Sequence, residues 1–379
     1  MAVVCDTGTG FLKLGWSYST YPEYVIPNIL GKPNRRFKFS EHYQGDLDKD
    51  YFDQEMRDML WNLDLIRPIE HGVITDWEAM SKIWTYGFIN RMHVDPSSTS
   101  IFLTEAPLNP KANREKMVEH MLEDFQFMGC KVETQATLTL VALGLNSGLV
   151  VDSGDGVTHC VPVCDSRLLT NSVKRIDVAG YDITTYLSHL LLKKGYQFFT
   201  SFDVDQVREI KENCCYLARD PREEMRLYQN TTASNMSYKL PDGNWVRIGP
   251  ERFQAAEVLF YPALIGKEEN GIPEMVYESL YEAPEDYRAI LAQNIILSGG
   301  TTMLPGFGQR LQKSLRDKVS EIGSPYKCKV LDPLNRKILV FLGAAIVALI
   351  LEAHPDQWIT REDWAEEGTR AVHKFDGKL

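Results

Sequence analysis

The amino-acid sequence predicts an α/β fold made of two similar lobes. This prediction depends on the length of the chain, on one repeated phrase, and on the alternation of strands with helices. At 379 residues the chain exceeds the size at which a single hydrophobic core keeps growing, so two or more lobes are expected. The phrase VVCDTGTGFLKLGW, residues 3–16, is echoed by LVVDSGDGVTHCVPV, residues 149–163. Asp6 and Asp152 begin the two turns and lie about one domain length apart in the sequence.

Strands and helices alternate in both halves. Each copy of the phrase has apolar residues on both sides of a glycine-rich turn, which is typical of a β-hairpin. Apolar residues recur at helical spacing in several stretches, as Trp77, Met80 and Ile83 do in the first of them. Helices are therefore predicted at 77–93, 111–126, 134–145, 180–194 and 203–217. Such alternation indicates a duplicated α/β unit.

Three other segments need separate interpretation. Residues 31–58 are polar and weakly periodic, so we expect a small inserted lobe with a mobile loop around 36–50. Residues 219–251 predict a loop followed by a hairpin that turns at Pro241–Gly243. The apolar run 339–351 is too short to span a bilayer and predicts a strand end followed by a buried helix.

The composition excludes several classes of partner. The net charge is −11 and the sequence pI is near 5.3, which argues against nucleic acid or an anionic membrane as a direct partner. No secretory signal or membrane segment is expected. The seven cysteines form no paired C-x-x-C motif, which favours reduced thiols in a cytosolic or nuclear protein.

The repeated turn has the chemistry of a phosphate site. The small residues Gly8, Thr9 and Gly10, and Gly154 and Gly156 in the second copy, let backbone N–H groups approach an anion. The turns also contain carboxylates, and these would repel a phosphate unless a divalent cation lay between them. Magnesium is held by one or two carboxylates plus phosphate oxygens, so the pattern predicts a Mg-nucleotide.

Two further features extend this site. Lys13 is either a cation for phosphate oxygens or a solvated strand residue. The segment IILSGGTTMLPG, residues 295–306, is an apolar strand that ends at Gly299 and Gly300 before a helix, which is another platform for an anion or a ribose.

Several phrases outside these turns resemble the actin family. They are PIEHG at 68–72, TEAPLNPKANREKM at 104–117, YKLPDG at 238–243 and QWITREDW at 357–364, together with the glycine-rich stretches DSGDGVTH and ILSGGTTMLPG. The resemblance implies a duplicated RNase-H-like fold of the actin, Hsp70 and sugar-kinase type, with ATP and Mg²⁺ or Ca²⁺ in an interlobe cleft. The implied first lobe is 1–142 plus 339–379, with 31–67 as a small inserted subdomain. The implied second lobe is 143–338, with 179–267 inserted.

The resemblance also assigns residues one by one. The implied phosphate-loop positions are Asp6, Gly8, Thr9, Gly10, Phe11 and Lys13 in the first copy, and Asp152, Gly154, Asp155 and Gly156 in the second. The implied ribose and adenine positions are Gly180, Lys211, Glu212, Gly299, Gly300, Thr301, Met303 and Lys337. Asp6 and Asp152 would hold the metal ion, mainly through water.

Three residues match the catalytic positions of the family. Gln135 matches the side chain that positions the attacking water, His159 the one that helps to relay its proton, and Asp152 the carboxylate beside the metal. A neutral Gln and a His can orient a water without strongly activating it, so at most a slow ATPase is expected. Taken alone, Gln135 could be a helix-face amide and His159 a packed strand residue.

Within the family, several stretches lean toward the subunit that nucleates branched actin filaments. They are GTGF at 8–11, QFMG at 126–129, GLVVDSGDGVTH at 148–159 and DITTYLSHLLLKKGY at 182–196. Other features depart from conventional actin. The loop between 31 and 51 is longer, GKEENG at 266–271 replaces an apolar plug, and Tyr181 and Leu304 replace an Arg and a Tyr near the nucleotide. Long homofilaments are therefore not expected.

Three function classes follow from these observations. The first is an ATP-binding cytoskeletal subunit that nucleates or templates actin filaments inside a multi-protein complex, with actin or another actin-related protein as partner. The second is an architectural, non-polymerising subunit of a chromatin-remodelling, dynactin-like or axonemal assembly. The third, a small-molecule kinase, is disfavoured because no base for a substrate hydroxyl stands out. Cytoplasmic, cytoskeletal residence is expected, with nucleus or cilium as alternatives, and His71 lies where the family can carry a methylated His.

Overall fold

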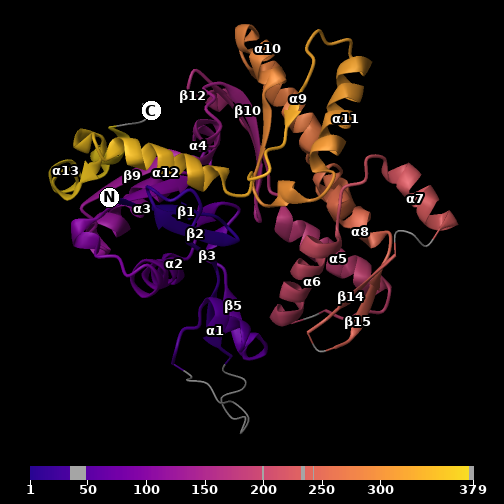
Figure 1. Cartoon of the computed structure of the whole chain (residues 1–379), viewed down its shortest axis with the longest axis horizontal. Coiled ribbons are helices and arrows are strands. Elements are labelled where there is room, and N and C mark those ends of the chain that lie inside the picture. Colours follow the sequence, from indigo (N-terminus) through magenta and orange to yellow (C-terminus); the bar gives the residue numbers. More distant parts are fainter. Residues whose placement is uncertain (35–47, 199, 232–234, 242, 375–379) are drawn as a thin grey trace. The chain divides into compact units, whose positions relative to one another are not determined.

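The computed structural model of the chain describes residues 1–34, 48–198, 200–231, 235–241 and 243–374. The chain divides into two compact units (Figure 1). The first comprises residues 1–150, 163–170 and 337–379, and the second comprises 151–162 and 171–336. The lobe boundaries inferred from the resemblance stay a prediction.

The first unit is built on a mixed sheet with the strand order β18-β9-β8-β1-β2-β3. Strands β1, β2 and β3 pair antiparallel, whereas β8 pairs parallel with both β1 and β9. The strands are β1 (Ala2–Thr7), β2 (Phe11–Trp16), β3 (Tyr24–Pro27), β8 (Ser100–Glu105), β9 (Gly129–Thr134) and β18 (Ile359–Thr360). The first copy of the repeated phrase is thus a β-hairpin, as predicted.

Both faces of this sheet are buried. Successive side chains of a strand point to opposite faces, so Val3 and Cys5 of β1 enter one hydrophobic cluster while Ala2 and Val4 enter another. The helices of the unit are α2 (Trp77–Thr85), α3 (Lys111–Glu119), α4 (Gln135–Ala142), α12 (Leu339–Leu351) and α13 (Arg361–Glu367). Helix α12 packs on α4 and β1, although it lies far from them in the sequence (Figure 1).

The crossing of α12 and α4 requires a glycine. A Cβ atom at Gly343 would lie 1.9 Å from the carbonyl oxygen of Leu138, so any side chain there would push the helices apart. Smaller elements complete the unit: α1 (Asp53–Arg57), the pair β4 (Leu30–Pro33) and β5 (Leu63–Ile66), and the pair β6 (Ile69–Glu70) and β7 (Val73–Ile74). Most of the loop expected around 36–50 lies outside the described residues.

The sheet of the second unit has the order β12-β11-β10-β16-β17, with β13 paired to β11. Its strands are β10 (Gly148–Ser153), β11 (Thr158–Cys164), β12 (Arg167–Leu168), β13 (Lys174–Ile176), β16 (Ile295–Ser298) and β17 (Val330–Leu331). In the first sheet β3 lies beyond one strand of the N-terminal hairpin, and β8, β9 and β18 lie beyond the other; in the second sheet β12 and β13 pair with one strand of the hairpin, and β16 and β17 lie beyond the other. The duplication predicted from the repeated phrase therefore extends to sheet topology.

Helices surround this second sheet. They are α5 (Gly180–Lys193), α6 (Ser201–Cys214), α7 (Pro221–Asn230), α8 (Glu251–Gln254), α9 (Ile272–Glu282), α10 (Glu285–Gln293) and α11 (Phe307–Glu321). The expected hairpin around 241–243 is formed by β14 (Met236–Lys239) and β15 (Trp245–Ile248). The five helices predicted from periodicity are all present, and α2 and α3 continue as π-helical turns to Arg91 and Asp124.

Two sequence predictions were wrong. The loop expected after 219 contains helix α7, because Asp220 accepts hydrogen bonds from the backbone N–H groups of Arg222 and Glu223 and Pro221 occupies the first helical position. The strand end expected at the start of 339–351 is absent from this described segment, which is a single buried helix. Across the described residues, every helix is too short or too polar to cross a membrane.

Candidate functional site

The first glycine turn joins β1 to β2. Gly8 N–H donates to the carbonyl oxygen of Phe11 at 3.1 Å, which closes the turn. A Cβ atom at Gly8 would lie 3.0 Å from that same oxygen, so the position tolerates little added volume. The backbone N–H groups of Thr9 and Gly10 have no acceptor among the described residues. Two free donors in a glycine-rich turn are the groups that an anion such as phosphate needs.

Asp6 lies on β1 just before this turn, and each oxygen of its carboxylate has a hydrogen-bond partner. Lys13 Nζ lies 2.7 Å from Asp6 Oδ2, and Thr104 Oγ1 donates to Asp6 Oδ1 at 2.7 Å. Asp6 is only 2% exposed. The antiparallel register pairs Asp6 directly with Lys13, so the alternation of strand residues puts the lysine on the same face. Of the two interpretations of Lys13, a freely solvated strand residue does not fit this ion pair.

Asn28 fixes the opposite side of the first turn. Its Nδ2 donates to the carbonyl oxygen of Gly8 at 2.9 Å, and its backbone N–H donates to that of Gly10 at 3.0 Å. Sequence reasoning missed both Asn28 and Thr104. Thr104 is the penultimate residue of β8, which pairs parallel with β1, and its approach to Asp6 depends on a strand order that the local sequence does not give. Nothing in the local sequence singles out Asn28.

Gln135 and Lys337 are two other predicted site residues in the first unit. Gln135 is the first residue of α4 and directly follows β9, which runs parallel to β8 and β1. Its carbonyl oxygen accepts a hydrogen bond from Thr139 Oγ1, and its side chain is half-buried. Lys337 Nζ lies 6.0 Å from the centroid of the Phe11 ring. Gln135 and Lys337 are therefore within the unit that contains the first turn.

The second glycine turn joins β10 to β11 and is closed in the same way. Gly154 N–H donates to the carbonyl oxygen of Val157 at 3.1 Å. The carbonyl oxygen of Gly154 accepts from Gly180 N–H at 3.1 Å and from Thr301 Oγ1 at 2.6 Å. Tyr181 N–H donates to the carbonyl oxygen of Asp155 at 2.8 Å. The structure thus brings the predicted residues Gly154, Asp155, Gly180 and Thr301 together.

Close backbone approach explains two of the glycines around this turn. Gly299 has φ +89°, and a Cβ atom there would lie 2.3 Å from the carbonyl oxygen of Ser153 and 2.8 Å from Asp152 Oδ1. A Cβ atom at Gly180 would lie 2.7 Å from Thr301 Oγ1. The strand end at 298–300 is therefore packed directly on the second turn, and Asp152 lies against it.

Lys211 contributes a buried ammonium group to this cluster. Its Nζ donates to the carbonyl oxygen of Gly180 at 2.8 Å, and the residue is 7% exposed. Burial lowers the pKa of Lys211, although the nearby carboxylates of Asp155 and Glu212 oppose that shift. The remaining predicted residues of this unit are Gly156, which is buried, Gly300, which precedes a short 3₁₀ helix, and Glu212 and Met303, which are exposed.

His159 lies on β11, seven residues after Asp152. The residue is 1% exposed, and its Nε2 has no hydrogen-bond partner among the described residues. Burial, with a further contribution from the neighbouring Arg175 guanidinium, lowers the pKa of His159 to about 3. The imidazole is therefore neutral near pH 7 and can still offer its unpartnered nitrogen to a water or a ligand oxygen.

The donor set for a metal ion is sparse in both units. Within the described residues, no group of three or more His, Cys, Asp or Glu side chains is arranged to hold a metal. The predicted ligands are single carboxylates, Asp6 in the first unit and Asp152 in the second. Such a set suits a hard cation that keeps most of its waters, as Mg²⁺ does, and it does not suit zinc.

Comparison with known proteins gives one consistent answer. The family model described as Actin matches residues 1–375. Actin-related protein 2 of Oryza sativa subsp. japonica is 42% identical over 98% of this chain and 97% of its own length. The proteins of the same name from Arabidopsis thaliana and Saccharomyces cerevisiae are 41% and 39% identical, each over 98% of both chains. These matches, with the duplicated α/β architecture, confirm the predicted resemblance and fold class: the chain belongs to the actin family.

Proposed function

We propose that this chain is an ATP-binding actin-related protein that serves as a subunit of a multi-protein complex which nucleates or templates branched actin filaments. The observation that carries this proposal is the similarity to actin-related protein 2 of plants and fungi, at about 40% identity over 98% of the chain. Similarity at this level runs through both units and is not confined to the phosphate turns. An architectural subunit of another assembly remains the alternative that the experiments below address.

The two glycine turns are proposed to bind the phosphates of one Mg-ATP. In the first turn, the free N–H groups of Thr9 and Gly10 would donate to phosphate oxygens. Lys13 would share its charge between Asp6 and the phosphates. Asp6 and Asp152 would hold the metal ion, mainly through its waters. When bound, Mg²⁺ supplies charge neutralisation at the triphosphate.

The nucleoside is proposed to bind around the second turn. Gly180, Lys211 and Glu212 lie on α5 and α6, and Gly299, Gly300, Thr301 and Met303 lie after β16. Gly299 and Gly180 pack so tightly on the second turn that a side chain at either position would clash with it, so both positions require glycine. Lys211 adds a buried cation beside these glycines. Lys337, in the first unit, completes the proposed set.

Hydrolysis is proposed to be slow. Gln135 would orient a water with its amide, and His159 would accept or pass on a proton through its unpartnered Nε2. The low pKa of His159, about 3, makes it a weak base at neutral pH. These side chains can position a water but cannot strongly activate it, so the chain is proposed to be at most a slow ATPase.

The proposed surroundings are cytoplasmic and cytoskeletal, with actin or another actin-related protein as partner. The segment 266–271 supports the expectation that long homofilaments do not form. Lys267 Nζ lies 3.2 Å from Asp182 Oδ1 and also donates to the carbonyl oxygen of Asp177. Placing this ion pair in an apolar subunit contact would require its desolvation, which is costly.

Nucleotide binding is tested by equilibrium dialysis of the full chain against Mg-ATP. Asp152→Ala should abolish binding, because it removes a metal-holding carboxylate from the second turn. Asp286→Ala, on the exposed surface of α10, removes the same charge and should bind as the wild type does. Normal affinity in Asp152→Ala would remove the second turn from the site.

Complex membership is tested by purifying the tagged chain from its native source and identifying the proteins that accompany it. The proposal expects the subunits of a branched-filament nucleating complex, and it expects the purified complex to accelerate the polymerisation of pyrene-labelled actin. Recovery of remodelling or axonemal proteins, with no effect on actin polymerisation, would favour the architectural alternative.

A further inference from the structure

A polar cavity lies within the first unit. Its volume is about 630 Å³, within the range of cavities that hold small-molecule ligands. It is lined by residues of β8, α3, β9, α4, β12 and the turn before β12, together with Ile359, Val372 and His373. None of the residues assigned above to ATP or the metal ion lines it. The cavity is therefore chemically separate from the proposed nucleotide site.

Basic side chains outnumber acidic ones in this cavity. Lys111, Arg114, Lys131 and Arg167 line it, against Glu105 and Glu133. This excess is notable in a chain whose net charge is −11. A cavity that is positive inside a negative protein is suited to concentrate an anion from solution.

The two carboxylates are already used inside the protein. Glu105 forms an ion pair with Arg114, and its other oxygen accepts a hydrogen bond from Asn109 Nδ2 at 2.9 Å. Glu133 accepts a hydrogen bond from the backbone N–H of Thr134 at 2.9 Å. Burial raises the pKa of Glu133, and the nearby ammonium group of Lys131 only partly offsets this shift. Neither carboxylate is therefore available to neutralise the outer cations.

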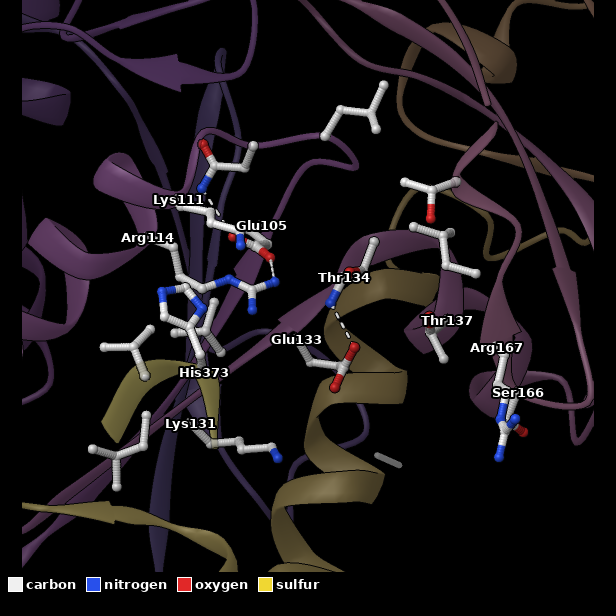
Figure 2. Close-up of a pocket in the computed structure, with 17 residues that line it drawn as sticks. Glu105, Lys111, Arg114, Lys131, Glu133, Thr134, Thr137, Ser166, Arg167 and His373 are labelled. Atoms are coloured by element: carbon white, nitrogen blue, oxygen red, sulfur yellow. Dashed lines mark hydrogen bonds and ion pairs between the residues drawn. The ribbon is translucent and has the colours of Figure 1, made fainter. Parts of the chain in front are cut away.

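Two cations remain for a ligand. Lys111 and Arg167 are exposed, and neither is paired with an acidic group among the described residues. Figure 2 shows Lys111 and Arg114 on one side of the cavity and Arg167 on the other, with Glu133 and Lys131 between them. Cations on two sides of one cavity suit a ligand with two separated anionic groups.

Helix termini add to the positive potential. Helix α3 begins at Lys111 and α4 begins directly after Thr134, and both positions line the cavity. Neither terminus has a side-chain cap. The first turn of a helix carries unpaired N–H groups and the positive end of its dipole. Both ends therefore support the anion preference that the side chains establish.

We propose that this cavity binds a small metabolite carrying two phosphate groups, one held by Lys111 and the other by Arg167. Phosphate is favoured over carboxylate because a phosphate monoester carries a charge of about −1.5 to −2 and three strong acceptor oxygens, and so gains more from an unpaired Lys or Arg than a singly charged carboxylate does. Bound there, such a ligand would link α3 to β12. This inference does not depend on the proposed function.

The test is isothermal titration calorimetry of the full chain with fructose 1,6-bisphosphate as the probe, in saturating Mg-ATP so that the glycine turns are occupied. Wild type should bind the probe. Lys111→Glu and Arg167→Glu should each weaken binding by about tenfold or more. Lys193→Glu, on the exposed last turn of α5, makes the same change in net charge and should leave binding unchanged.

Each other outcome overturns the assignment. Absence of binding to wild type at millimolar probe means that the cavity has no phosphate function. Equal weakening in Lys193→Glu and Lys111→Glu means that the effect is one of net charge. Tighter binding of citrate than of the bisphosphate would contradict the phosphate class, and binding of a hexaglutamate peptide in place of the bisphosphate would make the cavity a peptide site.

Discussion

The two glycine turns are closed by the same backbone hydrogen bond, but the basic residue beside each turn differs in charge. In both turns an aspartate on the first strand is followed seven residues later by a basic residue on the second strand: Lys13 follows Asp6, and His159 follows Asp152. Lys13 is bonded to Asp6 at 2.7 Å, whereas His159 is a buried, neutral ring with an unpartnered nitrogen. Duplication therefore kept the turn and changed the group behind it.

The two turns also differ in how they are supported. The first is fixed largely by side chains, that of Asn28 on the Gly8 carbonyl oxygen and that of Thr104 on Asp6. The second is fixed mainly by glycine backbone from α5 and from the end of β16, which packs against it at distances that exclude a side chain, together with one side-chain hydrogen bond from Thr301. This difference suggests that the first turn is sensitive to changes of charge and the second to changes of volume.

The largest expected effect is at the second turn. Gly299→Ala should lower the free energy of unfolding by about 3 kcal/mol or more, since the alanine would meet both a left-handed backbone and the carbonyl oxygen of Ser153. Gly8→Ala in the first turn should cost less than about 1 kcal/mol, since its Cβ would meet one oxygen at 3.0 Å. Urea unfolding followed by circular dichroism measures both. Equal losses would contradict the distinction.

The next effect is at the first turn. Lys13→Met leaves the buried Asp6 carboxylate without its cation, and should cost about 2 kcal/mol, less than a fully buried pair because Lys13 is 16% exposed. Thermal unfolding measures the loss. The double variant Asp6→Asn with Lys13→Met should recover part of it, because no charge is then left buried. A double variant no more stable than the single one would argue against this explanation.

His159, on the strand that follows the second turn, should make the free energy of unfolding depend on pH. The folded pKa of His159, about 3, lies below its unfolded value of about 6.5, so the unfolded state binds more protons between these values. Wild type should therefore lose stability as pH falls below 6.5, by about 2 kcal/mol between pH 6.5 and 5 from this group. His159→Gln should lack that part of the slope in urea titrations. Parallel slopes in the two proteins would contradict the assignment.

The smallest expected effect concerns one hydrogen bond. Thr301→Val removes the donor to the Gly154 carbonyl oxygen at 2.6 Å but leaves Gly180 N–H as a second donor to it. The cost should be about 1 kcal/mol in urea unfolding. A loss as large as that of Gly299→Ala would mean that the second turn is fixed by side chains after all.

Local pattern was enough to predict the elements of the fold, and much less of the site. The β1–β2 turn, α5 and the strand before Gly299 follow from apolar spacing and glycine signals within a few residues. Asn28 and Thr104 could not be assigned in this way, because their contacts with Gly8 and Asp6 join residues 20 and 98 positions apart. Such contacts depend on strand order, which a single sequence does not encode locally.

The two wrong predictions of secondary structure arise where hydrophobic spacing alone does not determine the element. Helix α7 was missed because its polar composition hides the signal, although Asp220 followed by Pro221 is a helix start. The run 339–351 is wrongly divided into strand and helix because a helix made of apolar residues throughout has no polar face to mark its period. The Asp220 cap determines the start of α7, and packing determines that 339–351 is one helix.

The central claim is that the two turns bind the same triphosphate. The most direct measurement is a crystal structure of the full chain with Mg²⁺ and a non-hydrolysable ATP analogue. The account predicts that the N–H groups of Thr9 and Gly10 and those of the second turn all contact one triphosphate, with waters of the metal ion bonded to Asp6 and Asp152. A nucleotide held by one turn alone, or bound elsewhere, would contradict it.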